Sequence, residues 1–166
     1  MEKTISKRYL HGNEPSAERT SEAQAQGTPT AETEGARCIL LAEDNPTHQE
    51  VALLLLTKVG CRVEVVSNGT EAVRALQQGD YALVLMDCQM PVMDGYEATR
   101  RIRDPHSGVR NPQIPIVAYT SSGTAEDFDR CLQAGMNDCV PKPADARALA
   151  GALSRWGIYP SAALRD

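Results

Sequence analysis

The feature that most constrains the fold of this chain is the alternation of five short, mainly apolar runs with five helical segments between Cys38 and Trp156. Each run suits a strand of a sheet, and several of the intervening segments end at a glycine, as helices commonly do. The expected strands are Cys38–Ala42, Arg62–Val66, Tyr81–Met86, Ile114–Tyr119 and Asp138–Val140, and the expected helices are Pro46–Val59, Thr70–Gln78, Tyr96–Arg103, Ala125–Ala134 and Asp145–Trp156. This order predicts an α/β fold: a five-stranded parallel sheet with helices on both faces, joined by right-handed crossovers.

The first 36 residues differ in composition from this alternating region. From Pro15 to Gly35 the segment is mostly Ser, Thr, Glu, Ala, Gln and Gly without any period. Such a segment cannot bury enough apolar surface to offset the entropy lost on ordering. We therefore expect a disordered leader or linker over residues 1–36, one domain over 37–158 and a flexible tail over 159–166.

Charge and hydropathy limit the partners of this chain. Its net charge of −5 gives no reason to expect a nucleic acid or an anionic membrane as a partner. No run approaches the ~18 apolar residues that a membrane-spanning helix needs, and the N-terminus lacks the pattern of a signal peptide. We expect a cytoplasmic segment without direct membrane contact, while an inner-membrane anchor elsewhere in a parent protein stays open.

The cysteines and histidines give no sign of a metal or disulfide framework. The five cysteines are odd in number and none has C-x-x-C spacing, which argues against structural disulfides and zinc. We expect buried, reduced thiols, and a redox role for Cys88 ranks below simple packing. His11, His48 and His106 are expected to be surface residues.

Polar side chains that could perform chemistry follow four of the predicted strands. They are Glu43 and Asp44 after the first strand, Asp87 after the third, Thr120 after the fourth and Lys142 after the fifth. In an open parallel sheet the carboxyl ends of the strands share one edge, and ligands bind there. Three carboxylates in one place repel one another, and Mg²⁺, a hard cation that prefers oxygen ligands, relieves the repulsion. Asp87 could then act as a nucleophile on phosphorus, while Lys142 and Thr120 neutralise and bind the phosphoryl oxygens.

Four motifs resemble response-regulator receiver domains, in order and at family spacing over roughly residues 37–156. They are the acidic pair in Leu40–Asn45, the phosphorylation-site signature in Leu85–Gly95, the strand and threonine in Pro115–Thr120, and Ala134–Asp138 followed by Pro141–Pro143. The second motif is most similar to the C-terminal receiver domains of hybrid sensor histidine kinases. The resemblance implies a flavodoxin-like doubly wound (βα)₅ fold with strand order 2-1-3-4-5.

The resemblance also implies roles for individual residues. Asp87 would accept the phosphoryl group, Thr120 and Lys142 would contact it, and the main-chain carbonyl of Gln89 would join the three carboxylates as an Mg²⁺ ligand. The bond between Lys142 and Pro143 is expected to be cis. Cys139 stands where family members usually carry Tyr or Phe, an aromatic that changes rotamer with the threonine. Either this exchange is tolerated, or the switch formed by Thr120 and residue 139 is altered, and Tyr119 or the helix Ala125–Ala134 carries the signal instead.

By the same resemblance, the phosphoryl donor would be a phosphohistidine on a histidine kinase core. The onward acceptor would be a histidine phosphotransfer domain, that is, a domain that passes the phosphoryl group on through its own histidine. The receiver would catalyse only its own phosphorylation and dephosphorylation, although the parent protein would be a histidine kinase. A stand-alone single-domain regulator is the alternative.

Three other classes of protein share parts of this pattern. An aspartyl-nucleophile phosphatase would need a second aspartate at Gln89, and a flavin-binding module would place Glu43 and Asp44 against a phosphate that they repel. A pseudo-receiver that binds partners without phosphorylation remains open because of Cys139.

Overall fold

The computed structural model describes residues 38–159, so the predicted leader over 1–36 and all of the predicted tail except Tyr159 lie outside the described residues. The strands are β1 (Cys38–Ala42), β2 (Arg62–Val66), β3 (Leu83–Asp87), β4 (Ile116–Thr120) and β5 (Asp138–Pro141). The helices are α2 (Pro46–Lys58), α3 (Gly69–Gln78), α4 (Gly95–Arg103), α5 (Ala125–Ala134) and α6 (Ala146–Arg155). All strand pairs are parallel and the sheet order is β2-β1-β3-β4-β5, as predicted.

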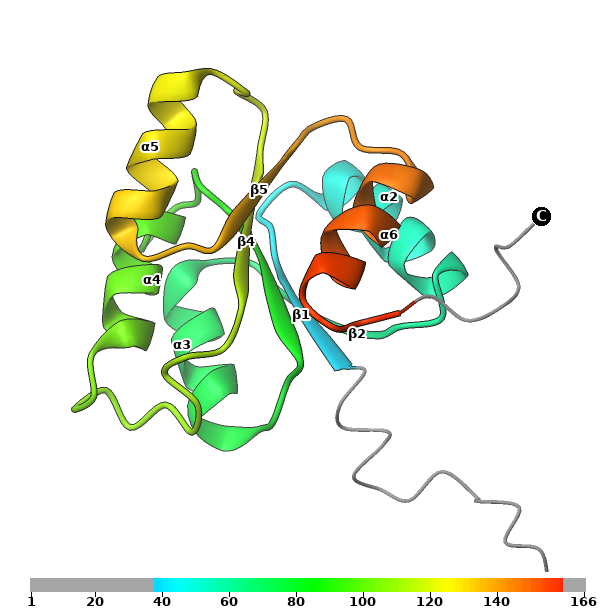
Figure 1. Ribbon diagram of the computed structural model, residues 1–166. Helices are drawn as coiled ribbons and strands as arrows, with labels where there is room; N and C mark the ends of the chain where they lie inside the picture. The colour runs from blue at the N-terminus through cyan, green and yellow to red at the C-terminus, as the bar shows by residue number, and fades with distance from the viewer. Residues whose placement is uncertain (1–37, 160–166) are drawn as a thin grey trace, which may run out of the picture.

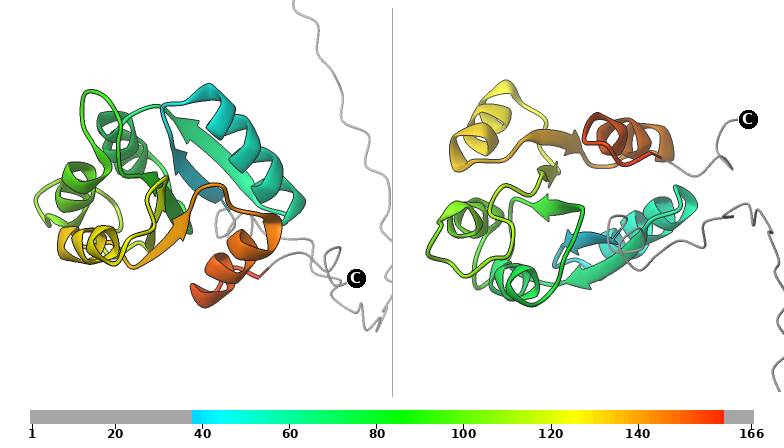
Figure 2. Two further views of the ribbon diagram at one scale, coloured as in Figure 1. Left: turned by 90° about the horizontal axis from the view of Figure 1, so that it is seen from above. Right: turned by 60° about the horizontal axis from the view of Figure 1, so that its bottom comes forward.

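Helices cover both faces of the sheet and enclose two separate apolar clusters (Figures 1 and 2). On one face, α2 and α6 pack on side chains such as Ile39, Leu85 and Val117. On the other face, α3, α4 and α5 pack on Leu40, Val84 and other alternate residues of the same strands. Because successive side chains of a strand point to opposite faces, each apolar run supplies both clusters. None of the helices described here combines the length and apolar character needed to cross a bilayer.

The bounds of β1 and β2 match the predicted ones, whereas those of β3, β4 and β5 differ by one or two residues. β4 begins at Ile116 instead of Ile114, because Ile114 donates its amide to Asn111 in a turn and Pro115 has no amide to donate. Ile114 is nevertheless buried, so its apolar character reports burial and not strand pairing. β3 begins at Leu83 instead of Tyr81 and includes Asp87, which pairs in register with Tyr119. The sheet therefore fixes the backbone of Asp87 itself.

The start of α2 joins the sheet to the predicted site. Asn45 caps this helix as predicted: its side-chain oxygen accepts from the amides of Thr47 and His48, and Pro46 occupies the first helical turn. The Asn45 amide donates in turn to the Glu43 carboxylate over 3.1 Å. Consequently the first turn of α2 is held directly against the carboxyl end of β1.

Candidate functional site

The carboxyl ends of four strands bring the predicted site residues to one rim of the sheet. Carboxylate oxygens of Glu43, Asp44 and Asp87 lie within 4.8 Å of one another. β1 and β3 are adjacent in the sheet although β2 lies between them in the sequence, so these acids stand at the point where strand order reverses. A hard divalent cation that prefers oxygen ligands fits this set of donors.

Glu43 is fully buried, and each of its oxygens has a partner. One oxygen accepts a hydrogen bond from the Asn45 amide, and the other accepts one from the ammonium of Lys142. Burial alone would raise the pKa of this carboxyl, but the bonds from Lys142 and Asn45 outweigh it and leave the pKa below its usual value. Glu43 therefore carries its negative charge inside the protein.

Asp87 is also buried, but its charge is less well compensated. Its Oδ1 accepts the Gln89 amide over 3.2 Å, and its Oδ2 lies 3.3 Å from the Lys142 nitrogen. Burial raises the pKa of Asp87 to about 6, and the nearby charge of Glu43 contributes to this rise. A cation bound between these acids would remove much of that cost.

Lys142 reaches the acids from the loop after β5. Its backbone amide donates to the carbonyl of Thr120 over 2.7 Å, which fixes the loop against the end of β4. Its ammonium lies over the Tyr119 ring, 4.9 Å from the ring centroid, and its side chain is only 8 % exposed. The Lys142–Pro143 bond is cis, as predicted.

Thr120 and Cys139 lie on neighbouring strands beside the acids. Thr120 is buried at the last position of β4, and its hydroxyl accepts the Ser122 amide over 3.2 Å. Cys139 pairs with Ala118, two residues before Thr120, and packs on the cluster beneath α3, α4 and α5. Because strand side chains alternate, Thr120 and Cys139 share the face of the sheet that these helices cover. The thiol belongs to the core and not to the acidic cluster.

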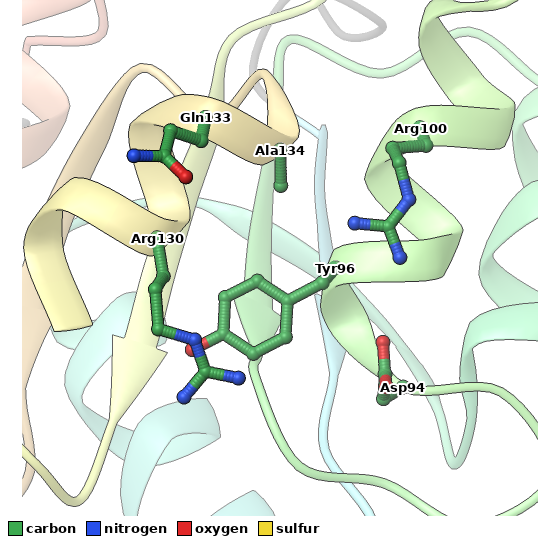
Figure 3. A pocket seen from close by; sticks show the side chains of 6 residues that line it. All are labelled: Asp94, Tyr96, Arg100, Arg130, Gln133 and Ala134. Atoms are coloured by element: carbon green, nitrogen blue, oxygen red, sulfur yellow. The ribbon is translucent and has the colours of Figure 1, made fainter.

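Asp44 and Gln89 are exposed and line an open hollow beside the acids. This hollow shares Tyr96 and Arg130 with a second one between α4 and α5, of about 360 Å³ (Figure 3). There the Arg130 guanidinium lies over the Tyr96 ring, 4.9 Å from its centroid, and Arg100 faces it from α4. The site is thus open toward the loop after β3 and enclosed toward Lys142.

Sequence reasoning missed the position of His48. This residue lies at the surface as expected, but its Nδ1 also lies 3.5 Å from both the Lys142 nitrogen and a Glu43 oxygen. The side chain is 45 % exposed, so it forms the outer edge of the site. The helical periodicity of α2 gives no signal for this contact, because it depends on a loop almost a hundred residues later in the chain.

Three of the five thiols are buried, as predicted: those of Cys61, Cys88 and Cys131. The sulfur atoms of Cys88 and Cys131 lie 3.6 Å apart, within reach of a hydrogen bond in which either thiol could be the donor. Burial raises the pKa of Cys88 to about 12, and it also raises the pKa of Cys131 and Cys139. Such protonated, enclosed thiols are poor nucleophiles, which favours the packing role.

A doubly wound parallel sheet with a cluster of acids and a lysine at its switch point defines a flavodoxin-like domain whose acidic rim could hold a metal ion. Residues 39–154 match the family model of the response regulator receiver domain, and the chain belongs to this family of two-component signalling proteins. It is homologous to the receivers of hybrid histidine kinases.

Two curated relatives are sensor kinases of very different organisms. Sensor protein GacS of Pseudomonas syringae is 40 % identical over 118 residues, and the match covers 71 % of this chain and 13 % of GacS. Hybrid signal transduction histidine kinase B of Dictyostelium discoideum is 42 % identical over 113 residues, covering 63 % of this chain and 6 % of the relative. The chain therefore spans only a small part of the curated relatives it matches.

Solved structures of similar domains include one with a bound metal ion and one with a bound partner protein. The receiver domain of sensor histidine kinase PA1611 from Pseudomonas aeruginosa, with magnesium in its active site cleft, has 44 % identity and a TM-score of 0.66; the match covers 72 % of this chain and 96 % of that one. The receiver domain of Ssk1 from Saccharomyces cerevisiae, in complex with the phosphotransfer protein Ypd1, has 33 % identity and a TM-score of 0.66, covering 72 % and 88 %.

Proposed function

We propose that this receiver domain accepts a phosphoryl group on Asp87 from a phosphohistidine, with Mg²⁺ held by Glu43, Asp44, Asp87 and the main-chain carbonyl of Gln89. The observation that carries the proposal is the approach of the Lys142 ammonium to two buried carboxylates at the rim where the third, Asp44, stays open to solvent. The magnesium in the cleft of the PA1611 receiver supports the choice of cation. When bound, the cation would neutralise the acids and the incoming phosphoryl oxygens.

The chain's own residues would then divide the work of transfer. An Asp87 oxygen attacks phosphorus, so that an O–P bond forms while the N–P bond of the phosphohistidine breaks and its electron pair returns to the imidazole. Lys142 moves its positive charge from Asp87 to the phosphoryl oxygens, and the Thr120 hydroxyl donates to another. The buried position of Lys142 supports this role, because a charge shielded from water acts more strongly.

The surface of α2 supports a helical partner, whether that partner is the phosphoryl donor or the onward acceptor. Val51 and Leu54 are 44 % and 57 % exposed, and this helix begins directly beside the acids. We propose that this apolar strip receives the histidine-bearing helix of a kinase core or of a phosphotransfer domain. The complex of the Ssk1 receiver with Ypd1 supports such pairing within the family.

We also propose that this chain is the receiver domain of a hybrid sensor histidine kinase and lies in the cytoplasmic part of that protein. The similarity to GacS and to the Dictyostelium hybrid kinases supports this context. In such a protein the signal would leave through Thr120 and the face made by α5, β5 and α6. The extent of the structural change that follows modification of Asp87 tests whether Cys139 alters that step.

A titration of backbone amide NMR signals tests these proposals together. Mg²⁺ is added first and then fluoroberyllate, a mimic of the phosphoryl group, to the wild-type chain and to Asp87→Asn. We expect shifts around Glu43, Asp87, Thr120 and Lys142 that fluoroberyllate extends in the wild type alone. An unchanged spectrum at millimolar Mg²⁺ would support the pseudo-receiver, the second candidate that Cys139 favours. Shifts that stop before α5 would show a receiver without the proposed output face.

A further inference from the structure

The imidazole of His48 touches the site but has no part in the chemistry proposed for Asp87. It is in the first turn of α2, where its backbone amide is fixed by the Asn45 cap. Its Nδ1 lies 3.5 Å from the Lys142 nitrogen, at the outer limit of a hydrogen bond. A lysine ammonium can only donate, so His48 Nδ1 accepts in this contact when the imidazole proton is on Nε2; the same Nδ1 also lies 3.5 Å from a Glu43 oxygen.

The surroundings of Lys142 give this weak contact its importance. The ammonium has three N–H groups, and three acceptors surround it: Glu43, Asp87 and His48. The lysine side chain is only 8 % exposed, so water has little access to replace any of them. In the unphosphorylated protein His48 is therefore one of three polar side chains within 3.5 Å of the ammonium, which also lies over the Tyr119 ring.

A phosphoryl group on Asp87 would change this balance. It brings several strong acceptor oxygens to Lys142, and the ammonium no longer needs the imidazole as a partner. A contact that stabilises only one of two states shifts the equilibrium toward that state.

We propose that His48 is a positioning residue that holds Lys142 in its unphosphorylated arrangement and thereby weakens the phosphorylated form. This inference rests on the proposed function of Asp87. On this inference, a residue in the first turn of α2 affects the stability of the phosphorylated state, in addition to the residues that bind the phosphoryl group.

The test compares the affinity for fluoroberyllate at saturating Mg²⁺ among variants of the full chain. His48→Leu removes the acceptor, His48→Asn retains one on a side chain, and Thr47→Ala alters an exposed neighbour in the same helical turn. Affinities are read from amide NMR titrations, with Mg²⁺ affinity and melting temperature measured separately. A contact worth about 0.5–1 kcal/mol corresponds to a change of roughly two- to fivefold.

We expect His48→Leu to bind fluoroberyllate two- to fivefold more tightly than the wild type at saturating Mg²⁺, with His48→Asn and Thr47→Ala close to the wild type. A merely structural role would weaken binding along with the melting temperature and could not tighten it. Equal or weaker binding by His48→Leu, or identical behaviour of the Leu and Asn variants, overturns the role of His48. Absence of binding to the wild type overturns the function proposed for Asp87 instead.

Discussion

Lys142 and Asp87 follow or end different strands far apart in the sequence, yet the Lys142 nitrogen lies 3.3 Å from Asp87 Oδ2 in a nearly enclosed position. The same nitrogen donates to the fully buried Glu43. One positive charge therefore holds two buried negative charges in place, and the folded state depends on all three. The consequences differ according to which charge is removed and whether a cation is supplied.

Replacing Lys142 by Met should destabilise the protein strongly in the absence of Mg²⁺. Removing one partner of a buried ion pair leaves the other charge uncompensated, so we expect a loss of about 3 kcal/mol in the free energy of unfolding at pH 7. Urea denaturation in a chelator measures this loss. Millimolar Mg²⁺ should restore more stability to Lys142→Met than to the wild type, because the cation replaces the missing charge. An equal response of both proteins to Mg²⁺ would contradict this account.

Replacing Asp87 by Asn should make stability less sensitive to pH. Burial raises the pKa of Asp87 from 3.8 to about 6, so between these values the folded protein binds more protons than the unfolded chain. The contribution of this group to stability is therefore greatest below about pH 4 and falls as pH rises toward 6. We expect the stability of Asp87→Asn relative to the wild type to increase by about 2–3 kcal/mol from pH 4 to pH 7 without Mg²⁺. A constant difference across that range would show that Asp87 ionises normally.

Gly95 allows α4 to approach the backbone of Asp87. A Cβ atom at this position would lie 2.1 Å from the Asp87 carbonyl oxygen, which the sheet holds in place. We expect Gly95→Ala to lose about 3 kcal/mol of stability and to lower the affinity for Mg²⁺ by displacing Asp87. Gly151→Ala is the matched control: it lies within α6 with only the end of the Arg155 side chain near, and it should gain about 0.5–1 kcal/mol. Thermal unfolding of both variants tests the contrast, and equal effects would refute it.

Arg103 should matter more for stability than its place at the end of α4 suggests. Its guanidinium donates to the carbonyls of Gly135, Pro112 and Ile114 and to the Asn137 side chain, over 2.6–3.0 Å. These bonds join α4 to the segments that precede β4 and β5. We expect Arg103→Ala to lower the free energy of unfolding by about 2–3 kcal/mol. Arg103→Lys should recover only part of this loss, since an ammonium lacks the planar, forked set of donors that reaches all four acceptors. Arg101→Ala, which removes only an exposed ion pair with Glu97, should change stability by less than about 0.5 kcal/mol in the same denaturation assay.

The sheet and the place of the acidic cluster could be predicted because each depends on a local pattern. The apolar runs such as Leu83–Asp87 identify the strands, and the rule that parallel strands end at one edge brings Glu43, Asp87 and Lys142 together. Strand limits were less predictable, as Ile114 shows, because burial and hydrogen-bonded pairing give the same apolar signal.

The contacts of His48 and Arg103 could not be predicted in this way. Both side chains reach groups that are distant in sequence, and their directions depend on how complete elements pack together. The 3.6-residue period places a side chain on a face of its own helix, but it does not say which loop passes that face. The position of Cys139 was predictable, whereas its effect on signalling stays a prediction.

The order of the charged residues along the chain also sets when their charges can balance during synthesis. Glu43 and Asp87 precede their countercharge, Lys142, which follows the last strand of the sheet. A chain emerging from the ribosome therefore holds these two acids without their buried partner until β5 has been made. The charges at this rim balance only when the sheet can be completed.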